Sequence, residues 1–183
     1  QLIEISRKLK REGMGWLQDI VPNHMAFDTR NPWLRDTLEK GIRSRYALFF
    51  DIDWHSNLFE GKVMVPFLGP PLEQVIRHGQ LKLEYRDDRL VIAYYDSLYP
   101  LNIRSYAAVF STCDKKYLTE IKKIEKQINE LEKIQDPVAY NEAWDNCIQH
   151  FISSFESADI QNCLNAINGN QDEILRIAND QHY

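Results

Sequence analysis

Apolar residues recur at intervals of three and four positions between residues 117 and 155, which limits this stretch to helices. The first stripe consists of Tyr117, Ile121, Ile124, Ile128 and Leu131. Asp136-Pro137 interrupts the pattern. The second stripe consists of Tyr140, Trp144, Ile148, Phe151 and Phe155. Because only a short turn joins the two stripes, we predict an antiparallel helical hairpin. A coiled-coil dimer is the weaker alternative, since the seam is shorter than three heptads.

The first 110 residues differ in composition from the rest. They hold six of the seven glycines and six of the seven prolines. Alternating apolar residues in 81–86 and 89–95 predict a β-hairpin that turns at Asp87-Asp88 without the usual glycine. Residues 62–68 are typical of a further strand, and Asn31-Pro32 is typical of a helix start. We therefore expect a loop-rich α+β region followed by a helical region, with the change near residue 110.

The chain begins with a pattern typical of a helix and a strand. Leu2, Ile5 and Leu9 share one helical face, Gly13 is a typical helix stop, and residues 14–21 are typical of a short strand. A helix, a short link and a strand form half of a βαβ unit. The apolar face of such a unit needs a cover, so we expect a possible homo-oligomer.

Composition argues against several classes of protein. The net charge of −5 disfavours a nucleic-acid partner, which needs a basic face. The sequence shows neither an apolar run long enough for a membrane span nor a leader, and it opens with Gln1, as in a fragment or processed chain. The three cysteines include no C-x-x-C pair, so we predict no disulfide framework, no zinc site and a cytoplasmic location.

A polar motif directly follows the predicted strand. Asp19, Asn23 and His24 form the pattern D-x-x-x-N-H, so their side chains would emerge at the carboxyl end of that strand. A carboxylate, an amide and an imidazole can together bind sugar hydroxyls and stabilise a cationic transition state. For the motif alone, a capped turn is the more common explanation.

The neighbouring residues make the motif more specific. Residues 15–26, with the sequence GWLQDIVPNHMA, resemble the first conserved region of the α-amylase superfamily. Several later strings are similar to the maltooligosyltrehalose synthase family in particular: NPW at 31–33, DTLEKG at 36–41, SRYA at 44–47, FDIDW at 50–54, VPFLG at 65–69, YPL at 99–101 and DQHY at 180–183. The resemblance covers most of residues 13–110 and returns at the end of the chain.

This resemblance implies a function and a set of binding residues. The family moves the reducing-end glucose of a maltooligosaccharide from an α-1,4 to an α,α-1,1 linkage by retaining intramolecular transglycosylation. Its nucleophile and acid/base carboxylates come from later barrel strands, so no catalytic residue is expected in this chain. His24 would contact the sugar, Asp19 would orient its neighbours and Asn23 would hold the loop. We predict no metal and no cofactor, since no cluster of carboxylates adjoins Asn23.

The implied fold class is α+β with a partial (β/α)8 TIM barrel. Residues 1–24 would form one helix–strand unit of the barrel, residues 25–110 an inserted α+β subdomain, and residues 111–183 a helical subdomain. Such a piece cannot close a barrel, which needs eight strands. The alternatives are a fragment of an α-amylase-type hydrolase and a non-catalytic carbohydrate-binding or interaction module.

Two further groups of residues receive structural interpretations. Asp51 and Asp53 could share a face of an extended segment, but a turn capped by Asp53 is the simpler reading. We expect Trp16 and Trp33 to be core residues; stacking on a sugar ring is the second interpretation.

Overall fold

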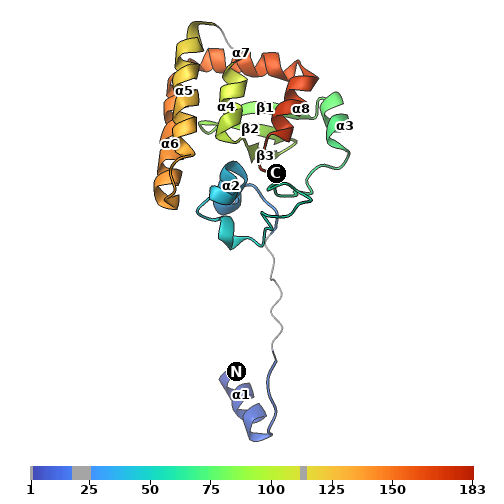
Figure 1. The fold of residues 1–183 in the computed structure, drawn as a ribbon. Coiled ribbons are helices and arrows are strands. Elements are labelled where there is room, and N and C mark those ends of the chain that lie inside the picture. The colour runs from blue at the N-terminus through green and yellow to red at the C-terminus, as the bar shows by residue number, and fades with distance from the viewer. Residues whose placement is uncertain (1, 18–25, 112–114) are drawn as a thin grey trace.

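The computed structural model describes residues 2–17, 26–111 and 115–183 (Figure 1). Its helices are α1 (Leu2–Arg11), α2 (Pro32–Lys40), α3 (Leu72–Arg77), α4 (Ile103–Phe110), α5 (Leu118–Leu131), α6 (Pro137–Ser153), α7 (Ser157–Asn168) and α8 (Gln171–Asn179). Short 3-10 helices are η1 (Gly41–Arg43), η2 (Ala47–Phe49) and η3 (Lys115–Tyr117). The strands are β1 (Leu81–Arg86), β2 (Arg89–Tyr94) and β3 (Ser97–Pro100).

The three strands form one antiparallel sheet in the order β1-β2-β3. The predicted hairpin is confirmed, with Arg86 paired to Arg89 across the turn. Asp87 and Asp88 have φ values of 49° and 56°, so two aspartates adopt the left-handed conformation that a tight hairpin turn requires. The strand predicted at 62–68 is wrong. The Val63 N–H bonds to the carbonyl of His182 at 2.7 Å, and this segment is not part of the sheet.

The predicted helical hairpin is also confirmed. Helices α5 and α6 lie side by side at one edge of the molecule (Figure 1). The Asp136 carboxylate accepts a hydrogen bond from the Ala139 N–H at 2.8 Å, and Pro137 takes the first helical position. The stripe residues of both helices, from Ile121 to Phe151, are buried within this chain, so a second copy is not needed to cover them.

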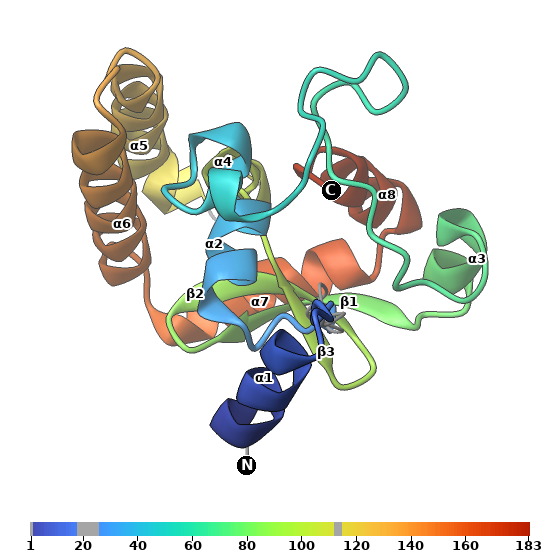
Figure 2. The same cartoon turned by 90° about the horizontal axis from the view of Figure 1, so that it is seen from below.

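One hydrophobic core runs through both compositional regions. Helix α7 packs on β1, and α4 contacts both α5 and α7 (Figures 1 and 2). The same buried cluster holds Leu38 and Leu83 from the first region and Ile148 and Phe151 from the second. At the opposite edge of the sheet from the helical hairpin, α3 packs against α8. Residues on the two sides of position 110 therefore share their packing.

The described residues at the beginning of the chain cover only part of the predicted barrel unit. Helix α1 forms as predicted and none of its residues is buried. Gly13 ends it with φ +66°. Residues 14–17 have no regular structure, and the rest of the predicted strand lies outside the described residues. The partial barrel therefore stays a prediction. Within the described part of the chain, no helix combines the length and apolar character needed to cross a bilayer.

The cysteines differ from expectation in one respect. Cys163 is disulfide-bonded, so the prediction of reduced cysteines is wrong for this residue. Spacing along the chain does not reveal which sulfurs meet in space, and this is why the sequence missed it. Cys147 is free and buried.

Cys147 is expected to resist thiol reagents in the native protein. Burial raises the pKa of its thiol to about 11, so the reactive thiolate is scarce at pH 8. We expect alkylation by iodoacetamide at pH 8 to be slow in the folded chain and fast in urea, with the Cys147 peptide followed by mass spectrometry. Equal rates in both conditions would show that α6 does not bury this side chain.

Candidate functional site

The three residues of the predicted sugar-binding motif, Asp19, Asn23 and His24, lie outside the described residues. The first ring after them, Phe27, stacks on Tyr99 with ring centroids 6.3 Å apart. Tyr99 also packs against Phe67 at 3.9 Å and Tyr183 at 6.1 Å. The Tyr183 hydroxyl donates a hydrogen bond to the carbonyl of Pro100 at 2.9 Å. This group of four rings, the Tyr99 cluster, joins the segment after the motif to residues 180–183.

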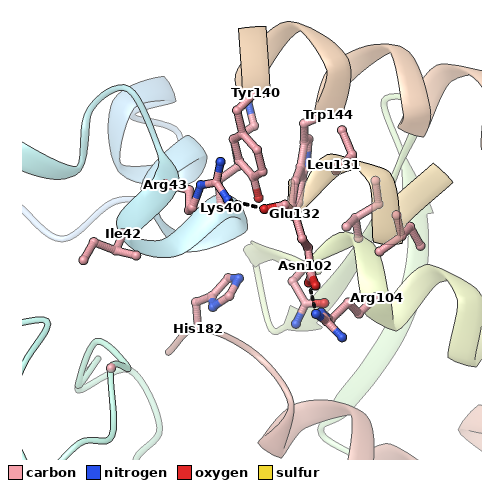
Figure 3. Close-up of a pocket in the computed structure, with 13 residues that line it drawn as sticks. Lys40, Ile42, Arg43, Asn102, Arg104, Leu131, Glu132, Tyr140, Trp144 and His182 are labelled. Carbon is pink, nitrogen blue, oxygen red and sulfur yellow. Dashed lines mark hydrogen bonds and ion pairs between the residues drawn. The ribbon is translucent and has the colours of Figure 1, made fainter. Parts of the chain in front are cut away.

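A cavity of about 330 Å³ lies between the η1 turn, the start of α4, the facing ends of α5 and α6, and the segment after α8 (Figure 3). Its walls combine charged, aromatic and aliphatic side chains. They are Lys40, Ile42, Arg43, Gly61, Asn102, Ile103, Arg104, Ile128, Leu131, Glu132, Tyr140, Trp144 and His182.

Arg43 connects the η1 turn to the helical hairpin. Its guanidinium lies over the Tyr140 ring, 3.8 Å from the centroid. It donates hydrogen bonds to the carbonyls of Glu132, at 3.4 Å, and Ile134. These carbonyls follow the last turn of α5, where a cation stabilises the negative end of the helix dipole. Arg43 thus closes one wall of the cavity.

Glu132 and Arg104 form an ion pair at the rim, and His182 faces them across the cavity (Figure 3). Burial lowers the pKa of the His182 imidazole, so the ring is neutral near pH 7. Gly41 makes room for this ring, since a Cβ at Gly41 would lie 3.0 Å from it. The positive φ of Gly41, +64°, also favours glycine at this turn.

A buried network of charges supports the cavity from α2. The Lys40 side chain is 2% exposed, and its ammonium lies 2.6 Å from Asp36 and 3.3 Å from Asp145. Its neighbour Glu39 accepts a hydrogen bond from the indole N–H of Trp144 at 3.3 Å. Burial raises the pKa of the Glu39 carboxyl, and the charge of Arg89 opposes this rise. Because Glu39 does not line the cavity, its role is to position α6 against α2.

Two of the earlier interpretations can be compared with the structure. Asp53 accepts a hydrogen bond from the His55 N–H at 3.1 Å, which confirms that it caps a turn. Trp16 and Trp33 are 45% and 44% exposed, so the expectation that they fill a core is wrong. Trp33 packs against Tyr46 and Phe49, and the three rings form an exposed group at α2 and η2. Each packs mainly on the others because neighbouring elements leave this surface uncovered.

The cavity does not contain the groups for glycosyl transfer. Retaining transfer needs two carboxylates about 5 Å apart. Glu132 is the one carboxylate among the lining residues, and it is paired with Arg104. No group of three metal-ligating side chains occurs within the ranges that the structure describes. The sequence did not point to this cavity. Arg43, Arg104 and Glu132 belong to no motif, and His182, which lies in the DQHY string, meets them only in the folded chain.

Comparisons with known proteins give one relationship. The chain is 41% identical over 70 residues to a protein named "Putative maltooligosyl trehalose synthase" in two strains of Mycobacterium tuberculosis, CDC 1551 / Oshkosh and ATCC 25618 / H37Rv. The match covers 37% of this chain and 9% of each relative, so the chain spans only a small part of their length. No family model and no solved structure matches.

This relationship agrees in part with the resemblance seen in the sequence. A 41% identity over 70 residues supports a partial relationship to these mycobacterial proteins. It does not extend to most of the chain, and it does not by itself give a role to the cavity or to the motif residues.

Proposed function

We propose that this chain is part of an enzyme that forms maltooligosyltrehalose from maltooligosaccharides. The observation that carries the proposal is the match of 41% identity over 70 residues to the mycobacterial relatives, which are named as such an enzyme. In the reaction, the α-1,4 bond to the reducing-end glucose breaks, and the anomeric carbon left by that bond is joined to the anomeric hydroxyl of the released glucose. A carboxylate nucleophile forms the covalent glycosyl intermediate. A second carboxyl group first donates its proton to the departing O4 and then takes the proton of the attacking anomeric hydroxyl.

In this proposal the chain supplies binding groups and the reacting carboxylates come from elsewhere in the enzyme. Asp19, Asn23 and His24 would lie at the rim of the sugar pocket, with His24 against the sugar at the cleaved bond. A carboxylate and a neutral imidazole there can accept and donate hydrogen bonds to sugar hydroxyls. The only carboxylate that lines the cavity in the described residues is Glu132, and its ion pair with Arg104 makes it unsuitable as a nucleophile.

The accompanying fold proposal is a barrel unit followed by an inserted subdomain. The Tyr99 cluster supports it, because Phe27 and Tyr183 pack against the same ring although 155 residues separate them. Segments that flank an inserted subdomain must lie close together. The homo-oligomer and the cytoplasmic location also remain predictions from the sequence.

A carbohydrate-binding module without chemistry is the second candidate. The exposed rings of Trp33 and Phe49, which pack against the half-buried Tyr46, favour it, since aromatic faces on a surface can stack on sugar rings. A hydrolase of the α-amylase type is a third possibility, and its products would distinguish it.

Product analysis separates these candidates. Maltopentaose is incubated with the longer enzyme that contains this sequence, and the products are analysed by NMR. The proposal expects an α,α-1,1-linked terminal unit and loss of the reducing end. Shorter reducing maltooligosaccharides would indicate a hydrolase instead. Unchanged substrate, together with saturable binding, would favour the module. His24→Ala is expected to lower the rate at least tenfold, while His78→Ala on the exposed end of α3 leaves it unchanged.

A further inference from the structure

We propose that the cavity between η1, α4, α5 and α6 is a second binding site for one glucosyl unit, apart from the predicted motif. This inference rests on the proposed function for the identity of the sugar, but the cavity's own chemistry indicates a small polyhydroxylated ligand. Two other candidates, the exposed rings around Trp33 and the open groove between α5 and α6, offer either no polar rim or no enclosure.

The size of the cavity suits a single sugar ring. Its volume of about 330 Å³ is at the lower end of the range of roughly 300–1,000 Å³ found for small-molecule sites. Its walls come from six segments, and residues 40–43 and 182 lie opposite α4 and α5 (Figure 3). A long peptide or a nucleotide would therefore not fit within it.

The polar groups of the cavity include both donors and acceptors of hydrogen bonds to hydroxyls. Arg43 and Arg104 each carry five guanidinium N–H donors, more than their bonds to Glu132 and Ile134 use. The Glu132 carboxylate can accept more than one hydrogen bond. The neutral His182 ring can donate with one nitrogen and accept with the other. Sugar hydroxyls both donate and accept, so they can use all of these groups.

The rest of the wall is apolar, which favours a sugar over an inorganic anion. Ile42, Ile103 and Leu131 line the cavity beside Tyr140 and Trp144. The C–H faces of a sugar ring can pack on such a surface, whereas a phosphate has no apolar face and would lose hydration against it. The cations are also already neutralised in part: Arg104 pairs with Glu132, and Lys40 pairs with Asp36 and Asp145.

A site of this kind would hold a glucosyl unit of the glucan through residues other than the motif. Binding energy from a remote unit of a substrate can be used to position the reacting unit. The chain would then favour maltooligosaccharides long enough to reach both the motif and the cavity.

NMR of the tryptophan indole N–H groups can test the proposal on the full 183-residue chain. Titration with maltose is expected to shift the Trp144 signal saturably and to leave those of Trp16 and Trp33 in place. Arg104→Ala is expected to weaken binding about tenfold, because the hydrogen bonds of a guanidinium are lost. Arg104→Lys should recover only part of the affinity, since a single ammonium lacks the planar fork. Arg176→Ala, which breaks a surface pair with Glu173, is the matched control and should bind normally.

Three outcomes would overturn the inference. They are a shift confined to Trp33, binding of inorganic phosphate but not of maltose, and the absence of any shift in a chain whose dispersed spectrum shows that it is folded. The proposed function fails separately. If maltose binds in the cavity but the longer enzyme forms no α,α-1,1 linkage, the cavity inference stands and the proposed function does not. If the linkage forms but maltose does not bind in the cavity, the proposed function stands and the cavity inference does not.

Discussion

Replacing Lys40 with alanine is expected to lower the free energy of unfolding by about 3 kcal/mol. The Lys40 side chain is almost fully buried, and its ammonium bridges Asp36 on α2 and Asp145 on α6. Its removal leaves two carboxylates close together, and Asp36 is itself mostly buried. Truncation also removes the aliphatic stem of the lysine from the wall of the cavity. Urea denaturation followed by circular dichroism measures the change.

Lys133→Ala is the matched control. Lys133 makes an ion pair with Glu130 in which both side chains are mostly exposed, and such pairs contribute about 0–1 kcal/mol. If the two variants lost the same small amount of stability, the network at Lys40 would be no more than a surface ion pair. The side-chain contacts between α2 and α6 would then need another explanation.

Phe151→Ala is expected to lower the free energy of unfolding by about 4 kcal/mol. The sheet and the helices are expected to be destabilised together. Phe151 is 0% exposed. Its ring packs against Tyr106 at 5.6 Å, Phe110 at 4.7 Å and Phe155 at 5.5 Å. Because these contacts join α4 to α6, the sheet and the helical hairpin should unfold in one transition.

Phe49→Ala is the control for this second variant. The Phe49 side chain is 62% exposed, so its truncation should change stability by less than about 1 kcal/mol. Two separate transitions in Phe151→Ala, with the sheet unaffected, would contradict a shared core. They would instead support independent subdomains that meet near residue 110.

Local patterns predicted the elements whose signals are local. The helix start at Asn31-Pro32, the break at Asp136-Pro137 and the stripes of α5 and α6 all agree with the structure. The hairpin at Asp87-Asp88 was also found, although two aspartates replace the usual glycine. In each case, neighbouring residues alone determine the conformation.

The remaining features depend on contacts between distant residues. Residues 62–68 have the composition of a strand but bond to the segment at 182 and not to a neighbouring strand. The sharing of one core across residue 110 depends on Phe110 and Phe151, and their contact is not visible in either local pattern. The exposure of Trp33 could not be predicted either, because the same apolar ring can fill a core or lie on a surface.

In the candidate site too, local features could be predicted and contacts between distant residues could not. The D-x-x-x-N-H motif is contiguous and could be recognised, although Asp19, Asn23 and His24 lie outside the described residues. The cavity could not be predicted, because Arg43, Arg104, Glu132 and His182 come together only through the packing of η1, α4, α5 and the segment after α8.

The most direct test of the central claim is the anomeric region of the proton NMR spectrum after incubation with maltopentaose. The account predicts that the longer enzyme containing this sequence forms an α,α-1,1 linkage, and that the 183-residue chain alone forms none because it lacks the carboxylate pair. Formation of the linkage by the chain alone would contradict the account. So would a longer enzyme that releases only reducing sugars.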